Sequence, residues 1–441
     1  MSYYNRNESR WKLGYFHRSM EKYKNIVILG GGFGGVRTAL SLSKKLKGIK
    51  DNNYRIVVVD KKEYHTFTPL LYEIATTSEQ TANDLQLKHF VTYNLKHILR
   101  DKHISVVEDT VLYVDINGKS VNLKYRSISF EYLVIALGAE TNYFDIQGLK
   151  KYALPLKTFN DAITIRNAIE TATIQKDRVK IIIGGGGPTG VELAGEIKSW
   201  GRELTGELHK KCAIDITIVD DGPMILSMFH QKIAMKAKKR LEKFGVKIMT
   251  GKRITEITKT NVILDDAELI PYNICVWTGG VKATTLTSEL PVQYEKRGRI
   301  EITEALECIA SNPNLNVCKN IYAIGDIACV YNPKTKQPTP LMARPAIVEG
   351  KIVAKNIIEK IKYGEKAKIY TYKPKNYPYI IPVGGKYAIA KIGPFTISGI
   401  LGWIFKGIVE LEYFMSILPF SKALKMWFRG FLIFIKNDKL G

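Results

Sequence analysis

The chain has 441 residues, 45% of them hydrophobic, and it is therefore too long for one ordinary domain and favours a globular protein of two or three domains. Its formal net charge of +24 favours anionic partners such as lipid headgroups, nucleic acid or anionic cofactors, without choosing among them. No uncharged apolar run reaches the roughly 18 residues that a spanning helix needs, which argues against a transmembrane helix.

The N-terminal segment, residues 1–24, is polar, aromatic and basic, and it lacks the apolar core of a secretory signal. Its arginines would suit an organellar transit peptide, whereas Glu8 and Glu21 argue against one. We therefore expect a basic N-terminal arm.

The first nucleotide-binding pattern is a glycine-rich loop at residues 30–35, directly after an apolar run at 26–29. In such a loop the first glycine permits a tight turn, the second lets the backbone approach a pyrophosphate, and the third lets the next helix pack close to the strand. Residues 55–59 then read as the second strand of this unit, which ends in Asp60, an acid placed to bind a ribose hydroxyl.

The same pattern recurs further along the chain. Residues 179–183 lead into a glycine-rich loop at 185–190, and residues 214–219 read as a second strand, which ends in Asp220. For either loop alone, a glycine-rich turn without a ligand is an alternative. Two such loops together indicate two bound dinucleotides, so that electrons can pass from one cofactor to the other.

Further buried strands are predicted where apolar runs lead into glycines. Residues 132–136 lead to Gly138, residues 274–278 lead to Gly279, and residues 320–324 lead to Asp326 through Gly325. Ligands of α/β sheets bind beyond the C-terminal ends of the strands, so Asp326 is placed to contact a cofactor.

The predicted fold class is α/β, with two doubly wound, Rossmann-like dinucleotide-binding domains, one inserted in the other, followed by an amphipathic helical region. The predicted boundaries are 1–24 for the basic arm, 25–150 and 295–396 for the first dinucleotide domain, 151–294 for the second, and 397–441 for the C-terminal helices.

The C-terminal region has apolar residues at helical spacing, a break at Pro419 and a second predicted helix at residues 421–435. The second helix has an aromatic side and a basic face, which fits a helix lying in the plane of an anionic membrane surface. The basic face comprises Lys422, Lys425, Arg429 and Lys436. A hairpin that caps the core and a dimer contact are the alternatives. The charges of Lys406, Glu410 and Glu412 in the first helix argue against a spanning segment.

The five cysteines are widely spaced, without a CxxC pattern or another close pair. This spacing argues against a zinc site and against a dithiol redox centre. We expect neutral thiols and no metal site. The cysteines are Cys212, Cys275, Cys308, Cys318 and Cys329.

Four stretches together resemble the type II NADH:quinone oxidoreductases, which are flavoproteins with two dinucleotide sites. The stretches are residues 64–75, 131–139, 187–196 and 325–328, and the resemblance runs from about Lys24 to at least Gly399. It implies FAD in the first unit and NADH in the second.

The resemblance also implies functional residues. Those expected to bind FAD are Gly30, Gly32, Phe33, Gly34, Gly35, Asp60, Thr68, Leu70, Gly138, Gly325, Asp326 and Ala343. Those expected to bind NADH are Gly185, Gly187, Thr189, Gly190, Asp220 and Gly279. Asp220 would repel a 2′-phosphate and so favour NADH over NADPH. Glu192 and Lys406 are expected near the nicotinamide, flavin and quinone as catalytic residues.

The activity implied by the resemblance is passage of a hydride from NADH to FAD and of two electrons to a membrane quinone, without proton pumping. The resemblance further implies a homodimer on the cytoplasmic face of the cell membrane, or on an organelle membrane in a eukaryote. His65 is either a proton donor or a structural residue beside the flavin segment.

The expected quinone segment departs from the family pattern alanine–glutamine–x–alanine–x–glutamine. Here Arg344 and Val348 replace the glutamines, and Pro345 removes a backbone donor. Arg344 would bind an acceptor carbonyl, bind a more anionic acceptor, or form a surface ion pair. The expected quinone contacts are Ala343, Arg344, Ile347 and Val348.

Two other functions compete with this one. A sulfide:quinone oxidoreductase needs paired cysteines at the flavin, and the absence of close cysteines at residues 141–178 argues against it. A flavoprotein that binds nucleic acid or a protein partner, similar to apoptosis-inducing flavoproteins, would also suit the charge. Because the basic residues are spread along the chain, we do not expect nucleic-acid binding.

Overall fold

The structure, a computed structural model, falls into two compact units that are described separately. The first unit comprises residues 1–65, 94–139 and 282–375, and the second comprises 66–93, 140–281 and 376–441. The described residues are 23–50, 52–84, 87–207, 209, 211–312, 318–332 and 336–437. The predicted N-terminal arm therefore lies outside the described residues up to position 22.

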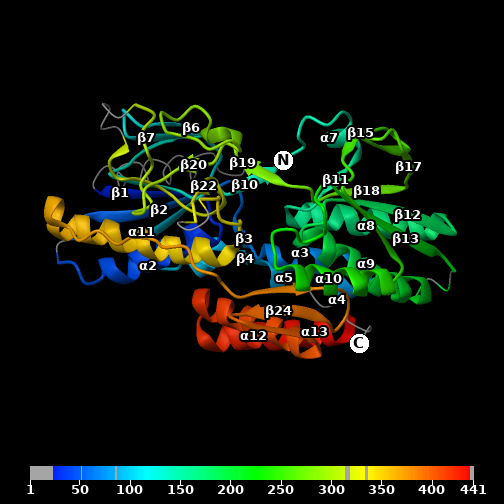
Figure 1. The fold of residues 1–441 in the computed structure, drawn as a ribbon. Coiled ribbons are helices and arrows are strands. Elements are labelled where there is room, and N and C mark those ends of the chain that lie inside the picture. The colour runs from blue at the N-terminus through cyan, green and yellow to red at the C-terminus, as the bar shows by residue number, and fades with distance from the viewer. Residues whose placement is uncertain are drawn as a thin grey trace, which may run out of the picture. The chain divides into compact units, whose positions relative to one another are not determined.

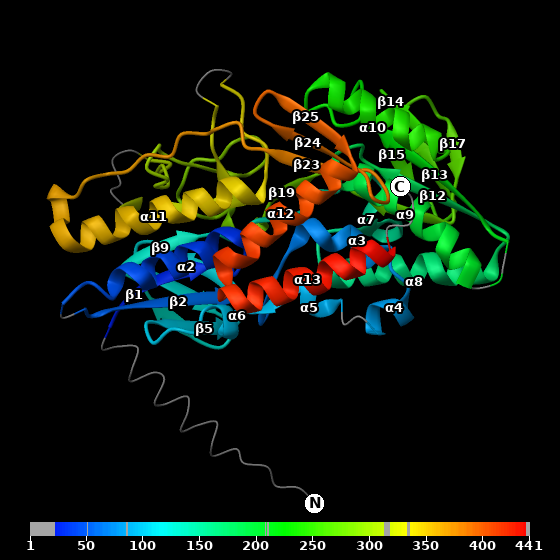
Figure 2. The ribbon, with the colours of Figure 1, turned by 90° about the horizontal axis from the view of Figure 1, so that it is seen from below.

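The first unit is built on a parallel sheet with the strand order β21-β9-β1-β2-β5. The strands are β1 (Lys24–Leu29), β2 (Tyr54–Asp60), β5 (Ile104–Glu108), β9 (Tyr132–Ile135) and β21 (Ile321–Ala323). Most residues of β1 and β9 are fully buried, as expected for parallel strands covered on both faces. Helices α2 (Phe33–Leu46) and α11 (Ala343–Tyr363) lie side by side in this unit (Figures 1 and 2).

The other layer of the first unit is an antiparallel sheet of β6 (Val111–Asp115), β7 (Ser120–Leu123) and β8 (Ser127–Ser129). Its apolar side chains share one core cluster with those of β1, β2 and β9. The shorter elements of the unit are β20 (Ile300–Glu301), η4 (Gly325–Ile327), β22 (Ala328–Cys329) and η5 (Gly364–Lys366).

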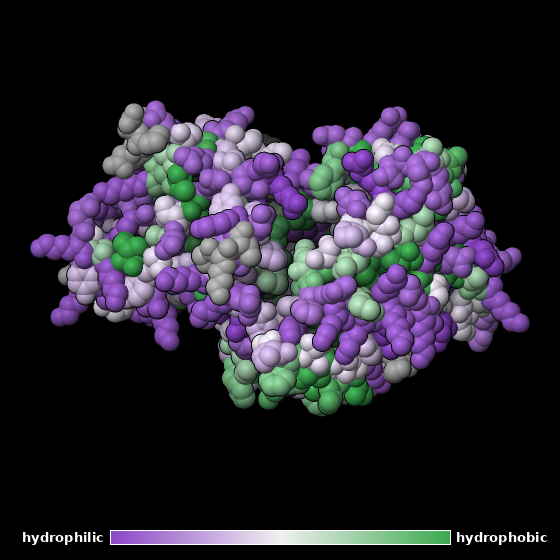
Figure 3. Space-filling model, viewed as in Figure 1, coloured by the Kyte–Doolittle hydropathy of each residue, from purple (hydrophilic) through white to green (hydrophobic). Residues whose placement is uncertain are grey.

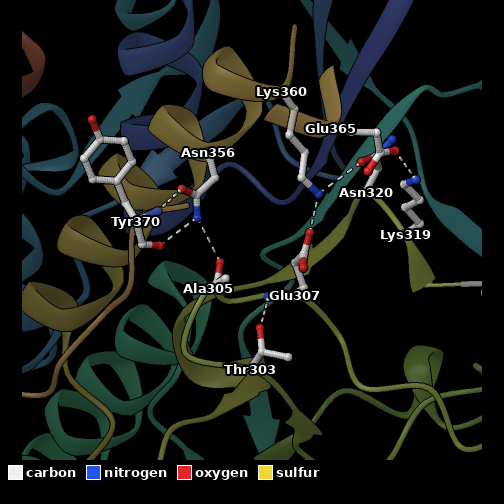
Figure 4. A network of polar contacts seen from close by, with 9 residues as sticks. All are labelled: Thr303, Ala305, Glu307, Lys319, Asn320, Asn356, Lys360, Glu365 and Tyr370. Carbon is white, nitrogen blue, oxygen red and sulfur yellow. Dashed lines mark hydrogen bonds and ion pairs between the residues drawn. The ribbon is translucent and has the colours of Figure 1, made fainter. Parts of the chain in front are cut away.

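A polar network ties helix α11 to the loops beside it (Figure 4). The fully buried Asn356 donates to the carbonyl oxygens of Ala305 and Tyr370 at 3.2 and 2.9 Å and accepts from the Tyr370 N–H at 2.8 Å. Lys360 forms an ion pair with Glu307. Because the Asn356 amide is satisfied on both its oxygen and nitrogen, it adds specificity to this packing without an unpaired polar group.

The second unit repeats the arrangement with the strand order β11-β18-β12-β13-β14, again parallel. The strands are β11 (Leu154–Pro155), β12 (Arg178–Gly184), β13 (Ala213–Asp220), β14 (Val246–Thr250) and β18 (Ile274–Trp277). The helices of this unit include α3 (Leu71–Ala75), α8 (Phe159–Gln175), α9 (Pro188–Glu207) and α10 (Gln231–Lys243). A small antiparallel sheet holds β15 (Ile254–Ile257), β16 (Asn261–Leu264) and β17 (Leu269–Pro271).

The C-terminal part of the second unit is a three-stranded antiparallel sheet followed by two helices. The elements are β23 (Tyr379–Pro382), β24 (Ala388–Ile392), β25 (Phe395–Gly399), α12 (Ile400–Ile417) and α13 (Phe420–Asn437). The two helices lie side by side (Figure 2), and the Trp427 Nε1–H of α13 donates to the Gly407 carbonyl of α12 at 2.6 Å. The break predicted at Pro419 is confirmed, because α12 ends at Ile417 and α13 begins at Phe420.

The predicted fold class is confirmed: both units carry a doubly wound parallel sheet, and helices follow at the C-terminus. The compact units divide the chain at different residues from the predicted domains, because residues 66–93 and 376–441 have their contacts in the second unit. None of the helices in the described parts of the chain combines the length and the apolar character needed to cross a bilayer.

Candidate active site

The first glycine-rich loop connects β1 to α2 in a conformation that glycine alone accepts readily. Gly30 has a φ of +106°, and a Cβ at Gly35 would lie 1.9 Å from the Gly30 carbonyl oxygen. A Cβ at Gly32 would meet nothing within 4 Å. The loop therefore turns tightly, lets α2 pack close to the strand, and leaves open space where its backbone would meet a pyrophosphate.

The second loop, between β12 and α9, reproduces these features. Gly185 has a φ of +108°, and a Cβ at Gly190 would lie 2.0 Å from the Gly185 carbonyl oxygen. A Cβ at Gly187 would again meet nothing within 4 Å. The same backbone requirements thus occur once in each unit, and each loop fits a dinucleotide.

The acids at the ends of β2 and β13 hold these loops by hydrogen bonds to their backbone. Asp60 Oδ2 accepts from the Gly31 N–H at 2.7 Å, and Asp220 Oδ2 accepts from the Gly186 N–H at 2.6 Å. Burial raises the pKa of Asp60, and backbone donors oppose that shift. Since a carboxylate has about four acceptor positions, each acid can also accept a ribose hydroxyl. The sequence pattern identified the acids but not their bonds to the loop.

His65 forms a hydrogen bond with the backbone of the first loop. Its side chain is buried, and its Nδ1 lies 2.8 Å from the Gly31 carbonyl oxygen. Burial lowers the pKa of His65 to about 4, so the ring is neutral near pH 7 and Nδ1 must carry the proton it donates. This geometry fits the structural alternative for His65 and gives no support to the proton donor.

Glu349 is a buried acid that sequence reasoning missed. It lies on α11, is 3% exposed, and its Oε2 accepts from the Gly325 N–H at 2.7 Å. Burial raises the pKa of Glu349 to about 7, and the neighbouring Asp326 contributes to that rise. Glu349 thereby holds the turn that presents Asp326. A glutamate inside the apolar pattern of α11 was the available signal.

The remaining residues expected at FAD are divided between the units. Phe33 meets the His65 ring edge-on at a centroid distance of 5.0 Å, and Gly138 is open on its Cβ side. Thr68 and Leu70 lie in the 3₁₀ helix η1 (Thr68–Leu70) of the second unit, where Thr68 is exposed and Leu70 is buried.

The second loop closes against the end of β18. The Thr278 hydroxyl donates to the carbonyl oxygens of Gly184 and Gly185 at 3.1 and 3.0 Å. A Cβ at Gly279 would lie 2.5 Å from the Trp277 ring, so this position needs glycine. Thr189 lies in the first turn of α9 and is partly exposed.

Glu192 and Lys406, predicted as catalytic residues, interact electrostatically within the second unit, where Lys406 is buried and Glu192 is partly buried. Lys406 Nζ lies 2.8 Å from Glu73 Oε1, 3.7 Å from Glu410 Oε1, and 5.3 Å from the centroid of the Tyr72 ring. Burial raises the pKa of Glu192 to about 8, the Lys406 charge opposes that rise, and Glu73 adds to it. Glu192 therefore holds a proton at neutral pH.

Helix α12 has an inverted distribution of polarity. It buries Lys406 and Glu410 at 9% and 7% exposure, whereas Leu401, Ile404 and Ile408 are 59%, 40% and 51% exposed. A helix on the surface of a protein in water normally shows the reverse, because burying charges costs free energy unless they are paired. The sequence showed these charges, but it did not show which face of the helix is buried.

The expected quinone segment forms the first turns of α11. Arg344 is exposed, and Ile347 and Val348 are partly buried. Ala343 is the first residue of α11, so Pro345 falls in the first turn, where backbone N–H groups have no partner within the helix. Pro345 therefore removes a donor without interrupting the helix.

The cysteines are free thiols in this structure, and four of them are buried. Burial raises the pKa of Cys275 to about 12 and that of Cys308 well above its usual value. Such thiols remain neutral, which argues against the dithiol chemistry that a sulfide-oxidising enzyme would need.

Two dinucleotide loops, each with its own acid, and a buried group of acids around a lysine define a two-dinucleotide oxidoreductase. Comparison with known proteins agrees with this class. The chain belongs to the pyridine nucleotide-disulphide oxidoreductase family, whose model matches residues 24–350.

Individual relatives that are 26–29% identical match nearly the whole chain. A protein of Mycobacterium tuberculosis (strain ATCC 25618 / H37Rv), named type II NADH:quinone oxidoreductase Ndh, is 26% identical over 432 residues, covering 92% of this chain and 88% of that protein. A type II NADH:quinone oxidoreductase of Staphylococcus aureus (strain MSSA476) is 29% identical over 418 residues, covering 91% and 98%. These relatives confirm the resemblance found in the sequence.

A solved structure supports the fold. The structure of NDH2 from Plasmodium falciparum in complex with NADH aligns with a TM-score of 0.79 and 20% identity, covering 95% of this chain and 99% of that one. At this identity the likeness establishes the fold.

Proposed function

We propose that this protein is a non-proton-pumping NADH:quinone oxidoreductase that uses FAD. The observation that carries the proposal is the presence of a complete dinucleotide loop, with its acid, in each of the two units. The relatives that span about nine-tenths of the chain are named for this activity. When bound, the flavin accepts a hydride from NADH and supplies two electrons to the acceptor.

The first loop binds the pyrophosphate of FAD. The backbone N–H groups at the start of α2 face the phosphates, and Asp60 accepts a ribose hydroxyl while it holds Gly31. Asp326, presented by the Gly325 turn that Glu349 holds, contacts the ribityl–pyrophosphate part. The other FAD contacts are Gly30, Gly32, Phe33, Gly34, Gly35, Thr68, Leu70, Gly138 and Ala343.

The second loop binds NADH. The start of α9 faces the pyrophosphate, and Asp220 accepts a hydroxyl of the adenosine ribose. A 2′-phosphate would meet the Asp220 charge, so NADH is favoured over NADPH. The other NADH contacts are Gly185, Gly187, Thr189, Gly190 and Gly279.

Glu192 and Lys406 handle protons for quinone reduction. Glu192 holds a proton at neutral pH because burial raises its pKa, and the Lys406 ammonium is a donor beside it. The buried Tyr72 hydroxyl in the same cluster has no hydrogen-bond partner among the described residues. An unpaired buried hydroxyl fits a site that receives a polar group of the acceptor.

We also propose that the first turns of α11 contact the acceptor. Ala343, Ile347 and Val348 provide apolar surface, and the Arg344 guanidinium supplies donors for an acceptor carbonyl. Since Arg344 and Val348 replace the glutamines of the family pattern, we expect the preference among quinones to differ from that of proteins with the glutamines.

The C-terminal helices dock on an anionic membrane surface. Apolar side chains gather over α12 and α13 (Figure 3), and beside them Lys422 and Lys425 are exposed. Each lysine near an anionic surface contributes roughly 1 kcal/mol. Arg429 and Lys436, also predicted on the basic face, have side chains outside the described set. The patch comprises Ile400, Leu401, Ile404, Ile408, Val409, Met415, Phe420, Leu424 and Phe428, each at least 40% exposed.

A peripheral position lets the enzyme meet a quinone dissolved in the bilayer. We place it on the cytoplasmic face of the cell membrane, or on an organelle membrane in a eukaryote, as a homodimer. Sedimentation of the detergent-free protein tests the dimer, because a monomer would sediment at 49.8 kDa.

An anaerobic titration tests the activity. The purified protein should be yellow, its flavin absorbance should bleach on addition of NADH, and the absorbance should return on addition of a menaquinone or ubiquinone analogue. Bleaching without recovery would eliminate quinone as the acceptor. Failure to bleach would eliminate NADH as the donor.

A flotation assay tests the membrane contact. The full chain should float with vesicles that contain anionic lipid, and a variant lacking residues 421–441 should float less. Equal flotation of both proteins would rule out α13 as the sole anchor.

A further inference from the structure

The charges around Lys406 are unbalanced. Lys406 Nζ faces the carboxyl oxygens of both Glu73 and Glu410, at 2.8 and 3.7 Å, and all three side chains are at most 11% exposed. Two ionised carboxylates beside one ammonium would leave a net negative charge in a site with little water, which is costly. A proton on one of the two carboxyl groups removes this cost.

The distances indicate which carboxyl holds the proton. Glu73 makes the short hydrogen bond with the ammonium, the geometry in which a carboxylate gains most from the Lys406 charge. The 3.7 Å separation of Glu410 from the same ammonium exceeds a hydrogen bond. Glu410 is therefore the group that gains least from ionisation.

The surroundings of Glu410 favour its neutral form. The titratable groups that interact with it are Lys406 on its own helix, Tyr72 and Glu73 on α3, and Tyr93 on β4 (Thr92–Asn94). Burial raises the pKa of Glu410 to about 7, Lys406 lowers it, and Glu73 raises it further. Glu192 and Glu196 of α9 also interact with Tyr72 in the same cluster.

We propose that Glu410 stores the proton that re-protonates Lys406 during quinone reduction, and that Glu73 is the fixed counter-charge that positions Lys406. This inference rests on the proposed function. In this proposal Glu73 is a positioning residue and Glu410 stores a proton, and both act through Lys406.

The proton transfer balances in two steps. Conversion of a quinone to a quinol requires two electrons and two protons; the hydride of NADH accounts for both electrons and one proton. Lys406 would supply the other proton by losing an N–H proton to an oxygen of the reduced acceptor. The O–H bond of Glu410 then breaks and an N–H bond of Lys406 forms, so the ammonium is restored between two carboxylates. A solvent proton returns to Glu410. Each turnover of NADH and quinone to NAD⁺ and quinol takes up one proton beyond the hydride, and one cycle of Glu410 supplies it.

Infrared difference spectroscopy tests the stored proton without any quinone. Spectra of the FAD-loaded protein at about pH 6 and about pH 9 separate protonated carboxyl groups from ionised ones, since these bracket the expected transition. Glu410→Gln keeps the shape of the side chain and removes the titration. Glu412→Gln, an exposed position on the same helix, is the matched control.

We expect Glu410→Gln to remove one protonated-carboxyl band that is present in the wild type and in the control. This band should differ from the one removed by Glu192→Gln. A Glu410→Gln spectrum that superimposes on the control overturns the proposal. If the amide variant is unfolded, Glu410→Asp keeps a carboxyl group, and its band should shift; an unshifted band would count against Glu410 equally.

The pH profile of quinone reduction provides the second test. Without the Glu410 proton, kcat for quinone should fall by about 100-fold, at the lower end of general acid–base effects, while KM for NADH is unchanged. Glu73→Gln should raise KM for quinone, because Lys406 loses its fixed partner. Equal pH profiles for Glu410→Gln and the control would refute the proton store. Absence of quinone reduction by the wild type would instead refute the proposed function and leave the infrared result standing.

Discussion

Glu349 allows a quantitative test of how burial controls ionisation in the first unit. The side chain is 3% exposed and accepts from the Gly325 N–H at 2.7 Å, beside Asp326. The substitution Glu349→Gln retains an acceptor oxygen for Gly325 and a similar volume, but it removes the titration. The comparison therefore isolates the free energy associated with the carboxyl proton.

The magnitude follows from the pKa shift. Burial raises the pKa of Glu349 from 4.5 to about 7. Between these values the folded protein holds a proton that the unfolded chain has released, so stability falls as pH rises, and the loss is complete above the folded-state pKa. Since one pKa unit corresponds to about 1.4 kcal/mol, the shift corresponds to about 3 kcal/mol.

The free energy of unfolding, measured by urea denaturation with far-UV circular dichroism, provides the assay. Relative to wild type, Glu349→Gln should gain about 3 kcal/mol between about pH 4.5 and about pH 8. Glu304→Gln is the control, because Glu304 is exposed in the same unit. Its stability should follow that of the wild type at every pH.

Parallel stability curves for wild type and Glu349→Gln would refute the reasoning. They would mean that Glu349 ionises normally in the folded protein, and that burial beside Gly325 does not hold its proton. If Glu349→Gln instead lost stability relative to wild type as pH rises, the surroundings of Glu349 would stabilise its carboxylate.

Other predictions concern the NADH loop and the membrane face. Gly190→Ala should weaken NADH binding at least about tenfold in a fluorescence titration, because the new Cβ would lie 2.0 Å from a loop carbonyl oxygen, whereas FAD content should be unchanged. Asp220→Asn should reduce the ratio of kcat/KM for NADH over NADPH by about tenfold, since a charge-assisted hydrogen bond is worth about 1.5–3 kcal/mol; an unchanged ratio would contradict the assigned role. Paired Ile404→Glu and Ile408→Glu substitutions should abolish flotation with vesicles while NADH still bleaches the flavin. The Leu269→Glu variant, at a position of β17 that is 59% exposed, should float normally, and loss of its flotation too would argue against a specific face.

Structural features that depend on a short stretch of backbone could be predicted from the amino-acid sequence. The tight turn at Gly30 and the close approach at Gly35 require residues without a Cβ, and the structure shows both. The two parallel sheets followed from apolar runs that precede these loops. Pro419 separates two helices because proline cannot continue the helix before it.

The sequence by itself determined the two nucleotide loops and their acids, because local backbone geometry dictates glycine spacing and strand ends. Tertiary structure decided the rest of the site. Glu73 lies 333 positions from Lys406 in the chain yet forms its ion pair, and a pattern of residues along one segment cannot show such a contact. The same holds for the inverted polarity of α12: its charges were visible in the sequence, but packing decides which face is buried and therefore whether Lys406 and Glu410 meet water or each other.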